Sequence, residues 1–436
     1  MKSPDTSFRY RITQMIAHHD LIRSRIPGIR KWYLQRFRKS QIEAAKRLRG
    51  KDRIEVAFFL SIPGMWKCDY LMKAMMANPK YHPYVVILPY SQYKGFSVDE
   101  VQTTLRRTEQ FVADKGYEYV IPYDAKRKKW EDIKKTLNPD ILILSDPYKD
   151  CLPQYFIYHF RDVLTCYVPY SLTILRIYRE NYGIMFVNLV GLFCLESPMH
   201  KQLALKYMHN GAENAVVTGY PGTEVFLDKN YKPADVWKPQ PVKKKRIIWA
   251  PHHSIDDAIS ISTFLLYCDD MLRLAEKYAD KVQWVFKPHQ LLKFKLQNIW
   301  GEQRTNEYYT KWSNLANGQL EEKSYVDYFL TADAMIHDSG SFTTEYLYTQ
   351  KPVMYLVRNK RQSDVLTPFG ELMFNAHYHG HNVDEIDAFI QKVVLEGVDE
   401  MKSVRQEVYD RYLKPIDGMM PSERIIYEIE KLINTP

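Results

Sequence analysis

Two short polar segments in the second half of the chain place histidine, lysine and hydroxyl side chains directly after apolar runs. The sequence WAPHHSIDD carries His252, His253 and Ser254, and the sequence FKPHQ carries Lys287 and His289. A histidine near neutral pH can act as a general base, or as a cation that faces phosphate oxygens. These residue types are able to bind phosphate and to move a proton, and Lys287 with His289 is predicted to contact a pyrophosphate.

A third segment, HDSGSFTTEYLYTQKP, is richer in small polar side chains than a plain turn requires. It runs straight into a predicted helix, and a helix N-terminus offers N–H groups and a positive dipole end to an anion. Gly340 permits close approach of the backbone. The alternative is that Ser341 only caps the helix, with Glu345 in a loose capping role. The predicted phosphate-binding group consists of Asp338, Ser339, Gly340, Ser341, Thr343 and Thr344.

These three segments can meet only if the apolar runs before them are neighbouring parallel strands. Strands RIIWAP, VQWVFKP, ADAMIHD and PVMYLV alternate with helices predicted over 258–278, 307–315 and 342–349, and helices near 383–395 and 422–433 follow. Continuous apolar strands separated by helices are typical of a parallel sheet covered on both faces. Because all carboxyl ends of such strands lie along one edge, we expect the three segments to share that edge.

The first half of the chain repeats this alternation. Its strands read IEVAFFL, YVVILP, YEYVIP, PDILILS, VLTCYVP, VGLFCLES and NAVVTGYP. A chain of 436 residues is too long for one ordinary core, and the Pro- and Lys-rich stretch DKNYKPADVWKPQPVKKKR lacks periodicity. We predict an α/β protein with two doubly wound Rossmann-like domains that face a central cleft. The predicted boundaries are a basic helical segment 1–52, a first domain 53–227, a linker 228–245 and a second domain 246–436.

The basic segment contributes strongly to the formal net charge of +9. Lys and Arg recur from Arg23 to Arg53, opposed only by Glu43 and Asp52, with Trp32 and other apolar side chains between them at helical spacing. Basic helices with Trp and Phe bind anionic lipid surfaces. The alternatives are a solvated helix packed on the domain, or a nucleic-acid arm. Since no nucleic-acid fold signature accompanies the charge, we predict contact with an anionic membrane surface and none with nucleic acid.

Other features restrict where the protein works. The longest apolar run, IMFVNLVGLFCL, is about half the ~20 residues that a membrane span requires, and is interpreted as a core strand or an interfacial patch. The start MKSPDTSFRYRITQ is charged and polar where a signal peptide needs an apolar stretch. The cysteines are scattered singly without a C-x-x-C pair, which fits a reducing cytoplasm.

A metal site is an alternative interpretation of the histidines. His252 and His253 could act with Asp256 and Asp257, but adjacent histidines point apart in an extended chain and no Asp-x-Asp spacing accompanies them. The alternating histidines of HYHGH, residues 377–381, follow a predicted helix without nearby carboxylates and are typical of a solvated loop. The sequence therefore predicts no metal and no cofactor.

At these residues the sequence resembles the CDP-glycerol glycerophosphotransferase family, the teichoic-acid primases and polymerases. The match runs from about Ile54 to Ile433 and rests on KPHQ, HDSGSFTTEYLYTQKPVMYL and DGMMPSERIIYEI, together with PDILILSDPY, CYVPYS and NAVVTGYPGTEVF. The resemblance implies a GT-B fold and a peripheral enzyme at the cytoplasmic face of the bacterial membrane. It also implies transfer of glycerol phosphate, or a related polyol phosphate, from CDP-glycerol or a similar CDP-alcohol to a hydroxyl of a lipid-linked glycan or polymer, with release of CMP.

Carried over by motif, the resemblance assigns roles to residues of the second domain. His289 would contact the donor pyrophosphate while an acceptor alkoxide attacks the β-phosphorus. The residues implied to lie near the donor phosphates are Ser339, Gly340, Ser341, Thr343 and Arg424. Two alternatives stay open: a GT-B glycosyltransferase that uses a nucleotide-sugar in capsule or surface polysaccharide synthesis, and a non-enzymatic scaffold at the membrane.

The general base is the part of the site where this sequence departs from the family. Polymerases of the family carry His-Gly after a strand of the N-terminal half, and the corresponding stretch here reads VPYS. The PHH loop also stands where the family has a Trp-Arg type sequence. His252, His253 and Asp69, from the IPGMWKCD loop, are therefore the candidate bases.

Overall fold

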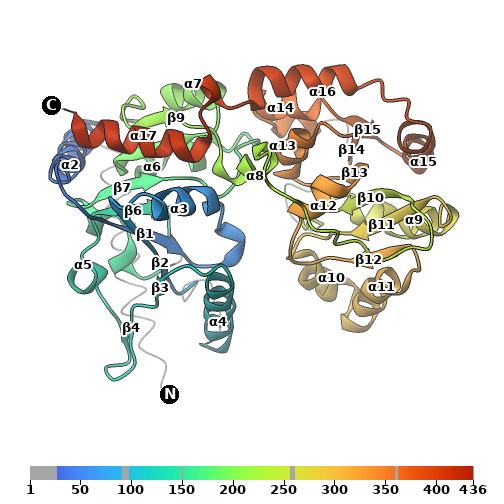
Figure 1. The fold of residues 1–436 in the computed structure, drawn as a ribbon, viewed down its shortest axis with the longest axis horizontal. Helices are drawn as coiled ribbons and strands as arrows, with labels where there is room; N and C mark the ends of the chain where they lie inside the picture. Colours follow the sequence, from blue (N-terminus) through green and yellow to red (C-terminus); the bar gives the residue numbers. More distant parts are fainter. Residues whose placement is uncertain (1–26, 91–97, 149–150, 256–260, 359–361, 436) are drawn as a thin grey trace. The chain divides into compact units, whose positions relative to one another are not determined.

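The chain folds into two compact units in a computed structural model (Figure 1). The structure describes residues 27–90, 98–148, 151–255, 261–358 and 362–435. Unit 1 contains residues up to Leu172, Ile177–Gly222 and the C-terminal residues from Pro415. Unit 2 contains Thr173–Arg176 and Thr223–Lys414.

Unit 1 is built on a parallel sheet of seven strands in the order β3–β2–β1–β6–β7–β8–β9. The strands are apolar along their whole length, as a sheet covered on both faces requires; in β1 every residue except Glu55 is buried. Their bounds are β1 Ile54–Leu60, β2 Tyr81–Ile87, β3 Tyr119–Val120, β6 Ile141–Leu144, β7 Leu164–Tyr167, β8 Leu192–Leu195 and β9 Ala215–Val217.

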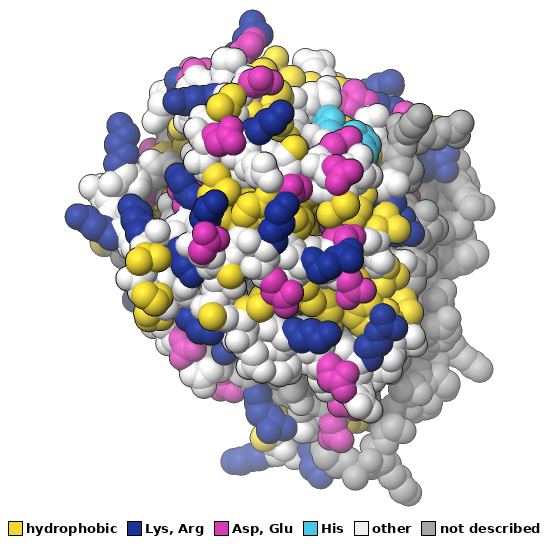
Figure 2. Space-filling view, turned by 90° about the vertical axis from the view of Figure 1, so that its right-hand side faces the viewer, with side chains coloured by type: hydrophobic (Ala, Val, Ile, Leu, Met, Phe, Trp, Pro, Cys, Tyr) yellow, Lys and Arg dark blue, Asp and Glu magenta, His cyan; other side chains and the backbone are white. Residues whose placement is uncertain are grey.

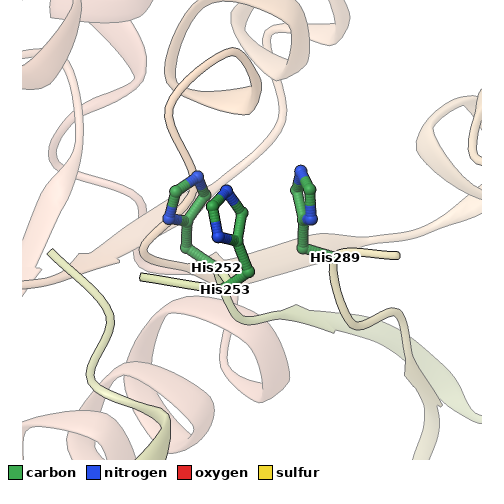
Figure 3. A group of neighbouring side chains, drawn as sticks. All are labelled: His252, His253 and His289. Atoms are coloured by element: carbon green, nitrogen blue, oxygen red, sulfur yellow. The ribbon is translucent and has the colours of Figure 1, made fainter. Parts of the chain in front are cut away.

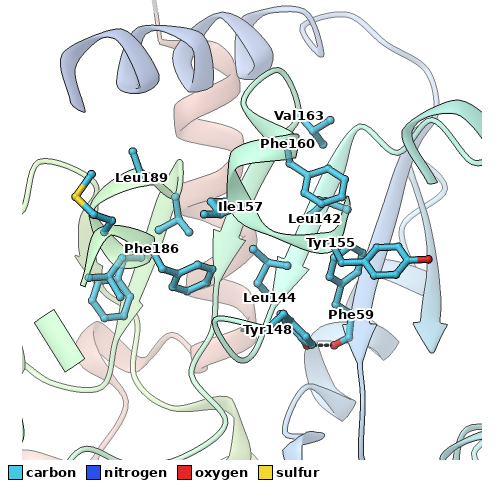
Figure 4. Packing of buried hydrophobic residues seen from close by; sticks show 14 of the residues in the cluster. Phe59, Leu142, Leu144, Tyr148, Tyr155, Ile157, Phe160, Val163, Phe186 and Leu189 are labelled. Carbon is cyan, nitrogen blue, oxygen red and sulfur yellow. Dashed lines mark hydrogen bonds between the residues drawn. The ribbon is translucent and has the colours of Figure 1, made fainter. Parts of the chain in front are cut away.

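Helices cover both faces of this sheet, because successive side chains of a strand point to opposite sides. Phe59 of β1 packs in one apolar cluster with Leu142 and Phe160 (Figure 4). The adjacent Phe58 packs in a second cluster with Leu71. The helices are α2 Pro27–Lys46, α3 Asp69–Met76, α4 Val98–Asp114, α5 Ile133–Thr136, α6 Met185–Leu189, α7 Pro198–Tyr207 and α17 Pro421–Asn434, with a small hairpin of β4 Tyr123–Asp124 and β5 Lys129–Trp130.

Helix α2 is the described part of the basic segment, and one of its faces belongs to the core of unit 1. Leu34 and Phe37 are buried there. The buried Gln41 donates from Nε2 to the carbonyl oxygen of Val163 (2.8 Å) and accepts from the Thr165 N–H (2.9 Å). The segment is therefore helical over Pro27–Lys46 in its described part, and one face of this helix packs on the domain, as the packing alternative expects. Trp32 on the other face is 57% exposed.

The last helix, α17, returns to unit 1, whereas the sequence interpretation had assigned residues 246–436 to one domain. Pro421 occupies its first turn and Glu423 accepts from the Met420 N–H (3.0 Å), both favourable at a helix start. Ile425, Ile429 and Ile433 are buried in the cluster that contains Leu71. This apolar stripe at helical spacing packs against α2 and α3, and no local pattern of α17 reveals these partners.

Unit 2 is a second parallel sheet, in the order β12–β11–β10–β13–β14–β15. Numbered along the chain, this is the 3-2-1-4-5-6 order of the Rossmann fold, in which the direction of strand addition reverses beside the first strand. The doubly wound α/β prediction is confirmed. The bounds are β10 Lys245–Ala250, β11 Val282–Phe286, β12 Gly318–Leu320, β13 Ala334–His337, β14 Val353–Leu356 and β15 Tyr378–Gly380.

Nine α-helices accompany these strands in the described part of unit 2: α8 Glu224–Leu227, α9 Phe264–Lys277, α10 Leu292–Trp300, α11 Glu302–Asn314, α12 Val326–Thr331, α13 Phe342–Glu345, α14 Pro368–Phe374, α15 Val383–Ala388 and α16 Lys402–Val408. The predicted helix over 258–278 begins, in the described residues, at Phe264. The segment predicted as a linker packs on unit 2, where the buried Trp237 donates to the Thr331 hydroxyl (2.8 Å).

The segment HYHGH, predicted as a solvated loop, contains the edge strand β15. His377 is buried, His379 stacks on Phe374 with ring centroids 4.1 Å apart, and only His381 is exposed. Tertiary contacts with α14 and Tyr355 bury this polar segment. The solvated-loop prediction is therefore wrong for His377 and His379, because Tyr355 packs against His377 and Phe374 stacks on His379.

The side of unit 2 shown in Figure 2 mixes cationic, anionic and apolar side chains. Among the described helices, none combines the length and apolar character that crossing a membrane requires. All five cysteines are buried thiols.

Candidate functional site

The three polar segments of unit 2 follow neighbouring strands at the point where the strand order reverses. In the register of the sheet, Trp249 of β10 pairs with Phe286 of β11, and Ala250 pairs with His337 of β13. The three strands therefore end level with one another, and the PHH, KPH and DSGS loops lie along one edge. This reversal is the position at which ligands bind in open α/β sheets.

His252, His253 and His289 form one cluster of imidazole rings (Figure 3). The ring centroids lie 4.2 Å apart for His252 and His253, 4.3 Å for His253 and His289, and 5.3 Å for His252 and His289. The expectation that adjacent histidines point apart is wrong here, because the chain is not extended. The Ile255 N–H donates to the carbonyl oxygen of His253 (2.8 Å), and this turn places both rings on one side.

The backbone of the cluster is tied together by hydrogen bonds between the loops. The His289 N–H donates to the carbonyl oxygen of Pro251 (3.0 Å). The Ser262 hydroxyl donates to the carbonyl oxygen of His252 (2.8 Å). The two loops therefore hold a fixed relative position, and helix α10 begins at Leu292, three residues after His289.

Asp338 is a positioning residue in this structure, although the sequence analysis predicted that it binds phosphate. It is 1% exposed. Its Oδ1 accepts from the His252 N–H, and its Oδ2 accepts from the N–H and hydroxyl of Thr263. Burial raises its pKa to about 6, against the opposing effect of these hydrogen bonds. The carboxylate is thus fully used in fixing the PHH loop to the end of β13.

Two of the ring nitrogens have local partners. Nδ1 of His252 lies 2.9 Å from the Ser254 hydroxyl and 3.2 Å from the Ser254 backbone nitrogen. Nδ1 of His289 lies 3.2 Å from the backbone nitrogen of Leu291. In these contacts the N–H groups of Ser254 and Leu291 donate to Nδ1 of His252 and His289, and they orient both rings.

Burial and neighbouring positive charge favour the uncharged form of His252 and His289. Burial, followed by the neighbouring His253 and His289, lowers the pKa of His252 to about 2. Burial, followed by His253 and Lys287, lowers the pKa of His289 to about 3. The positive charge of Lys295 acts in the same direction on both rings. A phosphate group would reverse this effect, since a nearby negative charge favours the protonated form.

The DSGS loop offers only part of the predicted phosphate-binding group to a ligand. Thr343 and Thr344 are 1% and 0% exposed, and the Thr343 hydroxyl donates to the carbonyl oxygen of Ser339 (2.7 Å). These two threonines therefore support the loop, contrary to the prediction. Gly340 and Ser341 are half-buried, and a Cβ built on Gly340 would meet nothing within 4 Å. The backbone at Gly340 is open to a ligand.

The capping alternative for this segment does not describe the structure either. Ser341 makes no side-chain cap to α13, which has only four residues. Glu345 is buried and accepts from the Tyr325 hydroxyl (2.6 Å). Its carboxylate is thus engaged in the fold of unit 2 and not at the start of the helix.

Asp69 and Arg424 lie in unit 1, outside this cluster of loops. The Asp69 carboxylate accepts from Trp66 Nε1 (2.7 Å), the Tyr117 hydroxyl (2.7 Å) and Lys115 Nζ (2.8 Å). Burial raises its pKa, but Lys115 and these hydrogen bonds outweigh burial, and the pKa is lowered. A carboxylate held ionised by three donors is a weak proton acceptor, so this geometry favours a structural role over the predicted role as base.

Arg424 has local partners as well. Its guanidinium lies 3.2 Å from the Asp417 carboxylate and over the ring of Tyr427. Because Arg424 belongs to unit 1, its place near the donor phosphates stays a prediction.

Sequence reasoning missed several residues that shape the site. Lys295 lies in α10, a helix that was not predicted, and Thr263 anchors Asp338. Arg358, after β14, donates to the carbonyl oxygen of Ser262 (2.7 Å). No local pattern marks these residues. Asp256 and Asp257, weighed as metal ligands, lie outside the described residues.

Comparison with known proteins gives one family and several solved structures. Residues 193–431 match the family model described as CDP-Glycerol:Poly(glycerophosphate) glycerophosphotransferase. No curated protein matches the chain.

The solved structures are distant in sequence and similar in fold. A variant of the wall teichoic acid polymerase TagF has a TM-score of 0.57 and 13% identity, with 95% of this chain and 99% of that chain covered. MnaA of S. aureus with UDP has a TM-score of 0.54 and 17% identity, with 88% and 97% covered. A TagF variant soaked with CDPG has a TM-score of 0.51 and 12% identity, with 94% and 97% covered. At these identities the similarity shows the fold alone, which is GT-B.

Proposed function

The chain belongs to the CDP-glycerol glycerophosphotransferase family, and we propose that it transfers glycerol phosphate from CDP-glycerol to a hydroxyl of a lipid-linked glycan or polymer. It is a CDP-glycerol glycerophosphotransferase-like enzyme, and the proposal concerns its donor, its acceptor and the residues that act. The observation that carries it is the level ending of β10, β11 and β13 in one polar edge inside the matched residues.

This edge suits a nucleotide's pyrophosphate. Lys287 and Lys295 provide positive charge near His289, and Gly340 and Ser341 offer an open stretch of backbone. Preorganised cations and N–H donors stabilise the charge that develops during phosphoryl transfer. The proposed donor position therefore places the pyrophosphate between the KPH and DSGS loops of unit 2.

The proposed reaction is displacement at the β-phosphorus of the donor. The acceptor oxygen forms a bond to this phosphorus, the bond from the phosphorus to the bridging oxygen breaks, and CMP leaves with that oxygen. The acceptor's proton passes to a base. Because the Asp69 carboxylate is held by three donors, we assign the base to His252 or His253. Bound phosphate would raise the pKa of His252, because a nearby negative charge favours the protonated form.

We also propose that the enzyme binds an anionic membrane surface through the exposed face of α2. Trp32 is exposed there, with the guanidinium of Arg36 5.4 Å from its ring centroid. A cavity of about 360 Å³ beside this helix is lined partly by Arg30, Lys31 and Arg38. Cations combined with an exposed Trp are the composition of interfacial helices. The proposed location is the cytoplasmic face of the membrane, where a lipid-linked acceptor would be reached.

Nucleotide release tests the reaction. Purified protein is incubated with bacterial membranes as acceptor and with CDP-glycerol, CDP-ribitol or common nucleotide-sugars. CMP release with incorporation of labelled glycerol is expected for CDP-glycerol and is expected to persist in His381→Gln, an exposed histidine outside the cluster. Release of nucleoside diphosphate from a nucleotide-sugar, without turnover of any CDP-alcohol, would replace this proposal with a glycosyltransferase.

Vesicle binding tests the membrane contact. Deleting residues before Asp52 would remove Phe37 and Gln41 from the core, so substitutions are the better probe. Lys31→Glu is expected to weaken binding to anionic vesicles about 5-fold or more, since each cationic residue near such a surface contributes about 1 kcal/mol. Lys126→Glu in the β4–β5 turn makes the same charge change and is expected to have a smaller effect. Equal effects of the two changes would reject α2 as the contact.

A further inference from the structure

We propose that His252, His253 and His289 together bind one divalent transition-metal ion of the Zn²⁺ class. The sequence alone predicted no metal, because the PHH loop was expected to be extended. In the structure each of the three residues offers a ring nitrogen, and these nitrogens lie within 4.8 Å of one another. The three rings stand side by side on the same side of their loops (Figure 3).

The spacing of the rings fits a metal centre with an open position. Zn–N bonds of about 2.0–2.1 Å place neighbouring ligand nitrogens about 3.4 Å apart in a tetrahedron. Ring rotations that move the nitrogens by about 1 Å therefore close the cluster around an ion. Three imidazoles occupy three positions and leave the fourth for a water or a substrate oxygen, as in catalytic zinc sites.

The surroundings of the rings provide the support that metal-binding histidines require. A metal-bound imidazole usually donates its other N–H to a fixed partner. In the tautomer that binds an ion through Nε2, the Ser254 hydroxyl, 2.9 Å from Nδ1 of His252, would accept the Nδ1 proton. The N–H groups of Ser254 and Leu291, which donate to Nδ1 of His252 and His289 in this structure (both 3.2 Å), would have to release these atoms. Asp338 fixes the His252 backbone, and the bond from the His289 N–H to Pro251 (3.0 Å) joins the two loops. The ligands are thus held before any ion arrives.

The ligand set also determines what the ion would do. All three ligands are neutral when they bind a metal, so the ion would keep its full charge of +2 and attract an anion to the open position. If the proposed function is correct, that anion is a phosphate oxygen of the donor; this step rests on the proposed function, whereas binding of the ion does not. The ion would then supply charge that neutral imidazoles lack. Because a ring nitrogen that binds the ion cannot accept a proton, the metal-bound form would require a base other than His252 and His253.

Metal binding is tested on the full chain without a tag and without substrate. Chelator-treated protein is titrated with Co²⁺, and one ion per chain is expected, with visible absorption typical of four-coordinate Co²⁺ and with displacement by Zn²⁺. His253→Ala and His289→Ala are expected to weaken binding by more than the ~10–100-fold that loss of a ligand's hydrogen-bond partner costs. Ser254→Ala is expected to weaken it by about 10-fold.

A control variant of a histidine elsewhere in unit 2 and a spectroscopic measurement complete the test. His381→Ala removes an exposed histidine and is expected to bind Co²⁺ as the wild type does. X-ray absorption of the Zn²⁺-loaded wild type is expected to show nitrogen and oxygen ligands with imidazole scattering. Three results would overturn the proposal: no stoichiometric binding, binding by the His253 and His289 variants that is as tight as that of the wild type, or sulfur ligands in the spectrum. The spectrum of the wild type decides even if a variant fails to fold.

Failure of the metal site and failure of the proposed function are distinguishable. Stoichiometric metal binding without CMP release would leave the site in place and reject the function. CMP release that is unchanged after chelation, in a protein that binds no Co²⁺, would reject the site and leave the function in place.

Discussion

The two units share a topology but differ in the chemistry at the carboxyl edge of their sheets. In unit 1, Tyr148 follows β6; its side chain is buried and its hydroxyl donates to the carbonyl oxygen of Phe59 (Figure 4). In unit 2 the corresponding loop after β13 carries Asp338 and the open backbone at Gly340. A parallel sheet provides the position of a site, and the loop residues decide whether it is used.

The largest expected effect is on kcat for CMP release, which a substitution in unit 2 should lower far more than a substitution in unit 1. His289→Ala removes a proposed contact to the transferring phosphates and is expected to lower kcat for CMP release about 10²–10³-fold, the usual cost of losing one preorganised donor. Asp69→Asn in unit 1 keeps the shape of a residue whose carboxylate serves Trp66, Tyr117 and Lys115. It is expected to lower Tm while kcat stays within about 3-fold, an effect on rate of less than 1 kcal/mol.

Both variants are compared by CMP release with CDP-glycerol and by thermal unfolding. Near-normal turnover in the His289 variant together with a large loss in the Asp69 variant would reverse the comparison. Asp69 would then be restored as the candidate base.

The next effect concerns the stability of unit 2. Asp338→Ala leaves the buried N–H groups of His252 and Thr263 without their carboxylate acceptor. Each unsatisfied buried group costs about 1–3 kcal/mol, so a loss of about 2–4 kcal/mol in the free energy of unfolding is expected. Denaturant titration measures it, with the exposed Asp280→Ala as control. A change no larger than that of the control would show that Asp338 does not hold the PHH loop.

Sequence patterns predicted the strands well because each core strand is a continuous apolar run. The β1 strand covers the run IEVAFFL, and β10, β11, β13 and β14 lie in the runs expected for them. The position of the three polar loops along one edge followed from parallel topology. These features depend on local composition and on rules that hold for any doubly wound sheet.

The misses share one physical cause, namely that composition does not reveal a side chain's environment, which local turns and tertiary packing set. The turn after His253 brings two adjacent rings to one side, and Phe374 covers His379. The return of α17 to unit 1 depends on apolar partners in α2 and α3. Thr343 and Thr344 look like ligands in a polar segment, yet the fold buries them.

The buried histidines of unit 2 predict a pH dependence of stability. Burial lowers the pKa of His377 from 6.5 to about 3, and His379 and Arg405 act in the same direction. Its neighbour His337 is buried 5.3 Å away, ring to ring, with its pKa also lowered. As the pH falls below 6.5 the unfolded chain binds a proton that the folded chain excludes, so stability is full above 6.5 and is lost toward pH 3.

The expected size of this effect is about 2 kcal/mol for His377 alone between pH 6.5 and pH 5, since each pH unit corresponds to about 1.4 kcal/mol. Calorimetry of the wild type and of His377→Gln measures it. The variant is expected to be less stable at pH 8 and to show a smaller loss on acidification. An identical pH slope in the two proteins would contradict the assignment.

The smallest effect has the opposite sign and lies in unit 1. His82 lies between Glu55, 2.6 Å from Nδ1, and Glu118, 3.0 Å from Nε2, and its pKa is raised first by the hydrogen bond to Glu55. Its contribution is therefore fully present below pH 6.5 and is lost as the pH rises through the folded pKa. Because the pair is partly exposed, His82→Gln is expected to cost only about 0.2–1 kcal/mol at pH 6 and nothing at pH 9. Calorimetric scans at both pH values measure this difference. Acid would thus weaken unit 2 while it strengthens this contact in unit 1, and a cost of His82→Gln that grows with pH would break the contrast.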